Sequence, residues 1–401
     1  MKKVFIVDAK RTAIGSMLGT LKGATPGEIG AAVVKNILET NNVDVNKVDQ
    51  LICGNILMAG QKQGVGRQVA INAGIPHTVP AYSVNMICGS GMKAVMNAYN
   101  DIKADFSNVV IAGGSEVMSN TPFLVPSSTR VGFKMGNMTV VDHMVNDALT
   151  DAFSGVHMGV TAENIANKYN ITRAEQDAFA IASQEKAIAS VDAGLFKNEI
   201  VPYVIKTKKE EIVFDTDEYP NRKTNLEKLG TLRPAFIKDG TVTAGNASGI
   251  NDGAAFLLVA SEEAVKENGF TPLVEIVSIG QGGVDPQVMG LGPVPAIRMA
   301  LKNAGLKLED IDLIELNEAF ASQSLGVIHE LVEEHGVTNE WILERTNVTG
   351  GAIALGHPVG ASGCRIIVTL IHNMLRLNKK VGLASLCIGG GMGTAIIVKL
   401  I

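Results

Sequence analysis

The chain has 401 residues, of which 46% are hydrophobic and 19% charged, and its 35 basic and 40 acidic side chains leave a formal net charge of −5. A chain of this length and composition buries a large core and folds into two or three domains, which excludes the disordered and fibrous classes. Because no basic stripe is present, nucleic acid is not an expected partner. Four widely spaced cysteines without a CxxC pair argue against a zinc site and a disulfide scaffold.

The first residues predict a β-strand rather than a targeting segment. The apolar run 4–7 is interrupted by Asp8 and is too short for a signal peptide. No apolar run approaches the ~18 residues that cross a bilayer. Residues 398–401 do not form a peroxisomal address. We therefore expect a cytoplasmic protein that does not bind membranes.

Elements of the first 118 residues alternate between strand and helix patterns. The expected order begins with a strand at 4–7, a helix at 27–39 and a strand at 51–52. Apolar residues at helical spacing over 92–102 then lead into an apolar strand at 109–112. This alternation is typical of an α/β fold.

Cys88 stands in the segment 85–92 (Asn-Met-Ile-Cys-Gly-Ser-Gly-Met), at a predicted turn from a strand to a helix. Free N–H groups and the dipole at a helix start lower the pKa of a cysteine from about 8.5, so we expect Cys88 to favour the thiolate and to act as a nucleophile. The neighbouring glycines allow a substrate to approach the backbone. The alternative is a buried structural cysteine, which is our interpretation of Cys53 and Cys364.

Residues 119–250 have a different character and are predicted to form an inserted loop domain. Proline, serine and glycine are frequent at its start, and a charged helix is expected at 173–189. The segments 157–159 and 246–249 could line a pocket, although each alone indicates a turn. The basic stretch 206–209 is typical of a solvated turn, with a polyanionic ligand as the alternative.

The C-terminal part repeats the order of the first part. Ser90 and Ser362 are 272 positions apart, and the same offset places the strand 109–112 on residues 381–384. The pattern favours a tandem duplication. We expect an N-terminal half at 1–118, the loop domain at 119–250, a helical return to the first half at 251–271, and a C-terminal half at 272–401.

Asn317 follows the predicted strand 313–316, at a strand end where α/β folds often place functional groups. The same pattern also fits an Asx turn that begins a helix. Both interpretations remain open from the residues alone.

His357 lies in a constrained turn before a helix, in the segment 356–363. The repeat aligns Gly360 with Cys88, so two halves packed about a pseudo-two-fold axis would bring His357 to Cys88. The alternative is a histidine bonded to local backbone. We prefer that alternative for His77, His143, His329, His335 and His372. His329 and His335 also miss the HExxH spacing of a metalloprotease.

Cys387 stands in the glycine-rich segment 385–394. This segment is not a dinucleotide-binding loop, because it leads into a strand at 395–399 and not into a helix. A cysteine beside three glycines fits a proton-transfer group next to backbone donors that form an oxyanion hole.

Four separated motifs together resemble the thiolases, over essentially the whole chain. They are residues 88–91 (Cys-Gly-Ser-Gly), 317–320 (Asn-Glu-Ala-Phe), 356–358 (Gly-His-Pro) and 387–391 (Cys-Ile-Gly-Gly-Gly). Within the family, the segment 157–159 and Ser248 resemble the short-chain type, the acetyl-CoA C-acetyltransferases.

The resemblance implies a five-layered αβαβα fold of two similar halves with a loop domain that helps to bind CoA, usually in a homotetramer or homodimer. It implies a ping-pong Claisen condensation of two acetyl-CoA to acetoacetyl-CoA and CoA, the reverse thiolysis, and no cofactor or metal. The roles that it implies are an acylated Cys88, His357 as its activator, Cys387 for the α-proton, Asn317 holding water in one oxyanion hole, and the N–H groups of Cys88 and Gly389 in the other. By position, the CoA and acyl pocket comprises Leu149, His157, Met158, Phe236, Ala244, Ser248, Met289, Ala319 and Phe320.

Other activities fit less well. A degradative 3-ketoacyl-CoA thiolase would use the same residues with a wider pocket, and His157 and Met158 favour the smaller substrate. A decarboxylating ketoacyl synthase resembles a Cys-His-His set, which this chain lacks. A non-catalytic CoA-binding scaffold would have lost a reacting group. Arg222, Lys223 and Lys228 are equal candidates for the CoA phosphates.

Overall fold

Two sets of strands with the same order form the central sheet. The computed structural model describes residues 2–206 and 208–401, and within this part ten strands join in one mixed sheet. In each set the first two strands are parallel and the rest are antiparallel. The sets are β3 (Gln50–Gly54), β5 (Val109–Val117), β10 (Asn251–Ser261) and β1 (Val4–Arg11), and β12 (Leu313–Leu316), β13 (Val381–Ile388), β14 (Met392–Leu400) and β11 (Val274–Gly283).

The two sets meet in the middle of the sheet, where β1 pairs briefly with β11. Phe5 lies opposite Glu275 and Ile6 opposite Val274. The short strand β4 (Ala81–Val84) forms the edge beside β3, and β2 (Gly15–Ser16) pairs with β10. The matching order of the two sets agrees with the duplication expected from the sequence.

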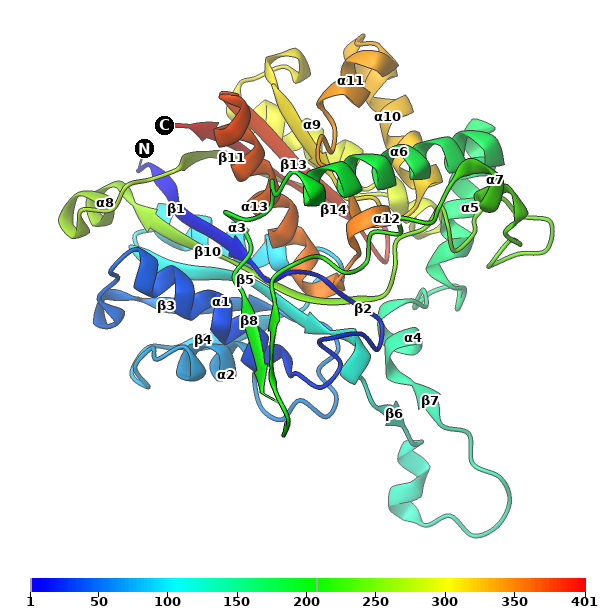
Figure 1. Cartoon of the computed structure of the whole chain (residues 1–401), viewed down its shortest axis with the longest axis horizontal. Coiled ribbons are helices and arrows are strands. Elements are labelled where there is room, and N and C mark those ends of the chain that lie inside the picture. Colours follow the sequence, from blue (N-terminus) through cyan, green and yellow to red (C-terminus); the bar gives the residue numbers. More distant parts are fainter. Residues whose placement is uncertain (1, 207) are drawn as a thin grey trace.

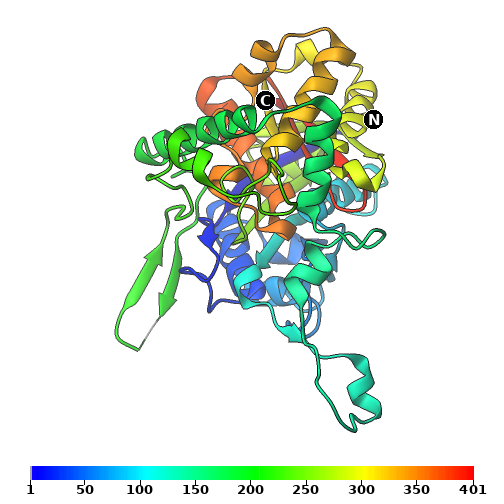
Figure 2. The same cartoon turned by 90° about the vertical axis from the view of Figure 1, so that its right-hand side faces the viewer.

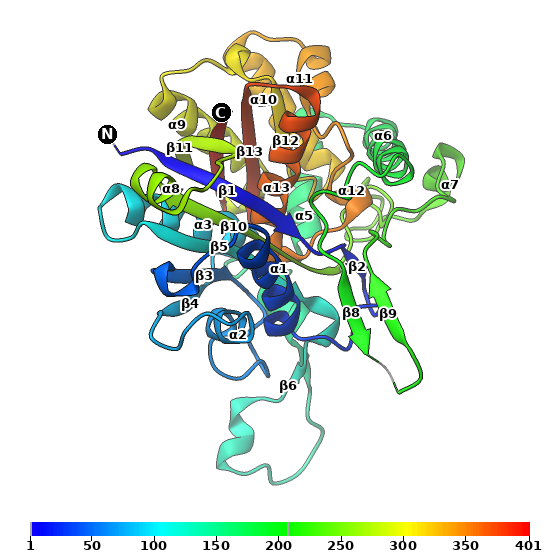
Figure 3. The same ribbon diagram turned by 60° about the vertical axis from the view of Figure 1, so that its left-hand side comes forward.

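Helices separate and cover the two half-sheets in five layers (Figures 1 and 3). Apolar residues of α3 and α13 fill one core between the half-sheets, while two further cores lie on the outer faces. The αβαβα fold expected from the family resemblance is therefore confirmed. The helices are α1 (Pro26–Thr40) and α2 (Val65–Asn72) outside the first half, α3 (Ser90–Lys103) and α13 (Val359–Leu377) in the middle, and α9 (Pro293–Ala304) and α10 (Ala321–His335) outside the second half.

The central helices α3 and α13 touch through their backbones near their first turns. A Cβ atom on Gly363 would lie 2.5 Å from the backbone nitrogen of Met92, and one on Gly91 would lie 2.9 Å from that of Cys364. Only glycine fits at such a distance. Gly91 and Gly363 are also aligned by the repeat, so the two helix starts lie side by side as the sequence predicted.

Most expected elements are present, but the prediction of a helical return at 251–271 is wrong for residues 251–261. Residues 251–261 form the strand β10, and only α8 (Glu262–Asn268) is helical. All eleven residues of β10 are buried, which is typical of a central strand covered on both faces. The run 254–260 is short and wholly apolar, a pattern that periodicity alone does not separate from a buried helix.

The insert contains an extended arm and a helical part (Figures 1 and 2). In the arm, β6 (Phe123–Leu124) pairs with β7 (Val141–Asp142), and the chain between them reaches away from the body. The helical part comprises α4 (His143–Ala148), α5 (Met158–Tyr169), α6 (Arg173–Asp192) and α7 (Leu226–Thr231). The charged helix expected at 173–189 is α6.

A hairpin of β8 (Tyr203–Lys206) and β9 (Glu211–Phe214) carries the basic stretch 206–209. Lys206 pairs with Glu211 at 3.2 Å, and residue 207 lies outside the described part of the chain. None of the described helices combines the length and the apolar composition needed to cross a bilayer.

Candidate active site

A cavity of about 410 Å³ brings together side chains from three distant parts of the chain. Cys88 from the first half and His357 and Cys387 from the second half all line it. The convergence predicted from the repeat is therefore present, because the paired starts of α3 and α13 carry Cys88 and His357 to one place.

A strained turn presents Cys88 between β4 and α3. The preceding Ile87 has a φ of 48°, a left-handed conformation that is a true outlier for a β-branched residue. Ser90 Oγ donates to the carbonyl of Ile87 at 2.6 Å and accepts the N–H of Met86 at 2.9 Å. Asn85 Oδ1 accepts the N–H of Ile87 at 3.0 Å. These local bonds hold the turn that a relaxed chain would avoid.

Burial raises the pKa of the Cys88 thiol to about 11, while hydrogen bonds from the N–H groups of Gly389 and of Cys88 itself act in the opposite direction. The expectation that the helix start alone favours the thiolate is thus wrong for the resting protein. Loss of solvation disfavours the charged form more than the helix start favours it. The thiol is neutral at pH 7 and needs a base.

His357 is held by hydrogen bonds that select one tautomer. Its Nδ1 lies 2.6 Å from Ser362 Oγ, and Ser362 Oγ donates its single proton to the carbonyl of Pro358 at 2.9 Å. Ser362 must therefore accept the proton of Nδ1, which leaves the lone pair on Nε2. The backbone N–H of His357 donates to Asn251 Oδ1 at 3.0 Å.

The imidazole of His357 is neutral as well as oriented. Burial, and then the nearby charge of Arg365, lowers the pKa of His357 to about 4. A neutral imidazole with a free Nε2 can take a proton from a thiol at pH 7. The cavity thus contains the base that Cys88 requires.

Cys387 is the next-to-last residue of strand β13, shortly before the turn formed by Gly390 and Gly391, which both have positive φ. Burial, and then the proximity of Cys88, raises the pKa of the Cys387 thiol well above its ordinary value. Gly389 lines an adjoining cavity of about 660 Å³. Its N–H reaches the sulfur of Cys88, so it stands at the wall between the two cavities.

Asn317 follows β12 and is fully buried, with its N–H bonded to the carbonyl of Ser385 at 3.0 Å. Neither its amide oxygen nor its amide nitrogen has a hydrogen-bond partner among the described residues. Buried polar atoms without partners are rare in native proteins. Asn317 is not among the residues that line the cavity, although Ala319 and Phe320 in the same segment are. Its amide is free for a bound water or a substrate oxygen.

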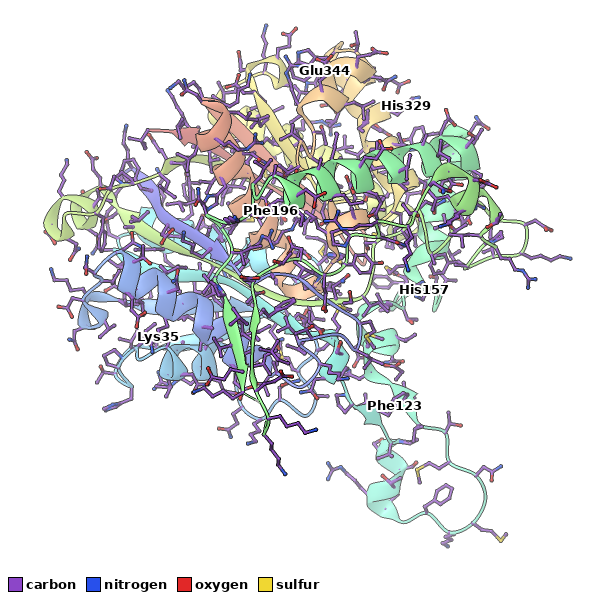
Figure 4. All side chains as sticks on the ribbon, in the orientation of Figure 1. Lys35, Phe123, His157, Phe196, His329 and Glu344 are labelled. Carbon is purple, nitrogen blue, oxygen red and sulfur yellow. The ribbon has the colours of Figure 1, made fainter. Side chains whose placement is uncertain are left out.

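The predicted CoA and acyl residues form one side of the same cavity. The His157 ring stacks on Phe236 with centroids 4.7 Å apart, and Phe236 meets the edge of Phe320 at 6.1 Å. Figure 4 shows His157 near the junction of the helical insert and the body. All nine predicted residues line the cavity, namely Leu149, His157, Met158, Phe236, Ala244, Ser248, Met289, Ala319 and Phe320.

Other residues of the cavity wall were not predicted. Tyr219 faces the cavity, and a Cβ atom on Gly249 would overlap its ring, so the glycine in 246–249 makes room for it. The position of Ser362, five residues after His357 and in the first turn of a helix, was the available sign of its role. The remaining unpredicted wall residues are Met17, Met118, Ala148, Ala235, Ile250 and Val359, whereas Ala247 belongs to the predicted segment 246–249.

The candidate phosphate ligands lie outside this cavity. Arg222 pairs with Asp192 at 2.5 Å, and Lys228 Nζ donates to the carbonyl of Lys223 at 2.7 Å. Cys53 and Cys364 are fully buried, as expected for structural cysteines.

Comparison with known proteins finds similarity to thiolases over nearly the whole chain. Models of the thiolase N-terminal and C-terminal domains match residues 4–263 and 270–400. The acetyl-CoA acetyltransferase of Pseudomonas aeruginosa is 51% identical over 397 residues, which is 99% of each chain. The solved acetyl-CoA acetyltransferase from Syntrophomonas wolfei is 42% identical, with a TM-score of 0.97 over 100% of both chains. The human mitochondrial 3-ketoacyl-CoA thiolase is 43% identical, with a TM-score of 0.94 over 100% of this chain and 99% of that one.

Proposed function

The chain belongs to the thiolase family, and on that premise we propose that it is an acetyl-CoA C-acetyltransferase. It joins two acetyl-CoA molecules to acetoacetyl-CoA and CoA, and it catalyses the reverse thiolysis. The observation that carries this proposal is one cavity lined by two thiols and a neutral imidazole from three distant segments. The reaction moves protons and an acyl group only, so we propose that it needs no metal or redox cofactor.

In the first half-reaction, His357 Nε2 takes the proton of Cys88, and the thiolate attacks the thioester carbonyl. The N–H groups of Cys88 and Gly389 stabilise the oxyanion, each worth about 2.7 to 4 kcal/mol in comparable sites. The C–S bond to CoA breaks, and the CoA thiolate leaves with the proton of Cys387. Acetyl-Cys88, a Cys387 thiolate and a protonated His357 remain.

In the second half-reaction, the Cys387 thiolate removes the α-proton of the second acetyl-CoA. Burial raises the pKa of Cys387, which makes its thiolate a strong base. The protonated His357 and a water on Asn317 stabilise the enolate oxygen. The enolate carbon attacks acetyl-Cys88, and the departing sulfur recovers its proton from His357.

The aromatic wall supports the short-chain substrate. The stacked His157 and Phe236, with Phe320 at the edge, enclose the space beside Cys387. A broader 3-ketoacyl-CoA thiolase is the second candidate, because the human mitochondrial 3-ketoacyl-CoA thiolase matches this chain with a TM-score of 0.94, against 0.97 for the S. wolfei enzyme. A higher kcat/KM for a long 3-ketoacyl-CoA than for acetoacetyl-CoA would favour this second candidate.

Mass spectrometry after incubation with acetyl-CoA tests the nucleophile and the substrate class together. We expect one acetyl group on the peptide that contains Cys88, and loss of this acetyl group and of both reaction directions in Cys88→Ser. Cys364→Ala is the matched control, because this cysteine is buried outside the cavity. Wild-type rates in Cys88→Ser would refute the assignment.

The arm of the insert supports an assembly of several copies. Its apolar side chains point into solvent, with Val131 88% and Met135 93% exposed. Figures 2 and 4 show the arm, with Phe123 at its base, projecting from the body. Exposed apolar patches of this kind mark interaction sites. We propose that second copies of this chain cover the arm in a homotetramer, with a homodimer as the simpler alternative.

A further inference from the structure

Helix α13, which follows His357, lacks a cap from its own sequence. No side chain of its own N-terminal segment bonds its first N–H groups. The N–H of Gly360, in the first turn, instead donates to Glu116 Oε2 at 3.1 Å. Glu116 comes from strand β5 in the other half and is 0% exposed. The helix start therefore depends on a carboxylate that is distant in sequence.

Both oxygens of Glu116 are occupied by N–H donors. Oε1 accepts from Asn55 Nδ2 at 2.9 Å and from the N–H of Leu57 at 3.2 Å. Oε2 accepts from the N–H of Ile56 at 2.9 Å as well as from Gly360. Four donors and no acceptor among these partners favour the ionised carboxylate, because a protonated one would have no acceptor here for its O–H. Burial raises the pKa of Glu116 to about 7, and the backbone donors counteract this rise.

Glycine at position 360 makes the contact possible. A Cβ atom there would overlap Glu116 Oε2. A negative charge at the N-terminus of a long helix is also favourable, because the first N–H groups are unsatisfied and carry the positive end of the dipole. Glu116 thus ties the loop after β3 to the first turn of α13, three residues from His357.

The start of α3, the equivalent place in the first half, is arranged differently. The repeat aligns Glu116 with Ile388, and Ile388 packs against Gly89, the residue before α3. At the start of α3, a hydrocarbon side chain therefore takes the place that a carboxylate has at the start of α13. The N–H groups of Cys88 and Gly389 there turn toward the reacting sulfur. Of two adjacent helix starts, one holds the protein's own anion and the other is open to substrate.

We propose that Glu116 is a positioning residue of the reaction. As a built-in anion at the start of α13, it fixes the turn that carries His357 against Cys88, and it leaves only the start of α3 for the developing oxyanion. This inference rests on the proposed thiolase function. Glu116 is absent from the cavity wall, so its effect on turnover is exerted through His357.

Replacement of Glu116 by Gln tests this role, because it keeps the volume and turns an amide NH₂ toward two N–H donors. We expect kcat for acetoacetyl-CoA to fall about tenfold or more with KM nearly unchanged, since small displacements of a reacting group cost such factors. The rate of Cys88 alkylation by iodoacetamide, measured without substrate, should fall by a factor similar to that of kcat.

Glu163→Gln is the matched control. Glu163 is 2% exposed and accepts the N–H groups of Thr241 and Val242, both at 2.8 Å, and neither partner belongs to α13 or to the turn of His357. We expect it to lower the melting temperature as Glu116→Gln does while Cys88 alkylation stays at the wild-type rate. Equal kcat and alkylation rates in the two variants would overturn the inference.

Asn55→Ala provides the test if Glu116→Gln does not fold. It removes one donor from the carboxylate and keeps the charge, so kcat should fall at least about threefold at constant KM. Unchanged kcat in this variant contradicts the inference. A wild-type protein without acetoacetyl-CoA turnover would instead contradict the proposed function.

Discussion

Two cysteines share one cavity but are held by different parts of the chain. Cys88 lies before a helix, in a turn strained at Ile87, and Cys387 lies near the end of a buried strand. Burial raises the pKa of both thiols. Because both are neutral at rest, each needs a specific proton acceptor, and their roles are separable by substitution.

Cys387→Ala should leave acylation intact and stop condensation. In this variant the protonated His357 can give its proton to the departing CoA thiolate in place of Cys387, so Cys88 is still acylated. The α-proton of the second acetyl-CoA then has no base, so condensation should fall at least about 100-fold. Mass spectrometry should find acetyl-Cys88 that persists with excess acetyl-CoA. Normal condensation in this variant would show that another group removes the proton.

Ser362→Ala should impair His357 without touching the substrate. The alanine removes the acceptor of the Nδ1 proton, so the tautomer with a free Nε2 loses its support. We expect kcat to fall about tenfold or more at similar KM. Ser278→Ala removes another buried hydroxyl, bonded to the carbonyl of Ala300, and serves as the control. An equal effect of both changes would argue against the tautomer assignment.

At the scale of elements, the site depends on the backbone contact between α3 and α13. These helices carry Cys88 and His357 at neighbouring ends, and glycines set their separation. The contact lies between the two half-sheets, where packing is dense and backbone atoms have little freedom to move. Any added volume there changes both stability and the alignment of the reacting groups.

Gly91→Ala tests this contact. The new Cβ atom would lie 2.9 Å from the nitrogen of Cys364 and the carbonyl oxygen of Gly360, both backbone atoms. We expect the free energy of unfolding to fall by about 1 to 3 kcal/mol, together with a loss of kcat. Gly230→Ala, also in a helix, meets no atom within 4 Å and should be neutral or stabilising by roughly 0.5 to 1 kcal/mol. Chemical denaturation of both variants provides the comparison.

At the scale of the whole molecule, the arm is a segment whose apolar side chains remain exposed in the single chain. Its apolar residues contrast with the buried apolar residues of the body. Substitution of Val131 and Met135 by Asp should therefore reduce the assembly to smaller species with a monomer fold unchanged by circular dichroism.

Analytical ultracentrifugation measures this change. Phe106→Asp, at a residue 77% exposed outside the arm, is the control and should keep the native assembly. An arm variant that retains the wild-type sedimentation coefficient would refute the proposed role of the arm in assembly.

The sequence by itself determined the order of elements, the duplication and the four motifs, because strand and helix periods and glycine turns are local properties. It placed Cys88, His357 and Cys387 at the correct kinds of turn. It failed at residues 251–261, where a short apolar run fits a buried strand and a buried helix equally well.

Only the tertiary structure decided how these pieces act on each other. The raised pKa of Cys88 comes from burial that no local pattern records, and it reversed the expectation from the helix start. Tyr219 in the cavity wall and Glu116 at the start of α13 reach their places by contacts between segments far apart in sequence. Burial and proximity arise when such segments pack together, and this is why they are decided by the fold and not by local sequence.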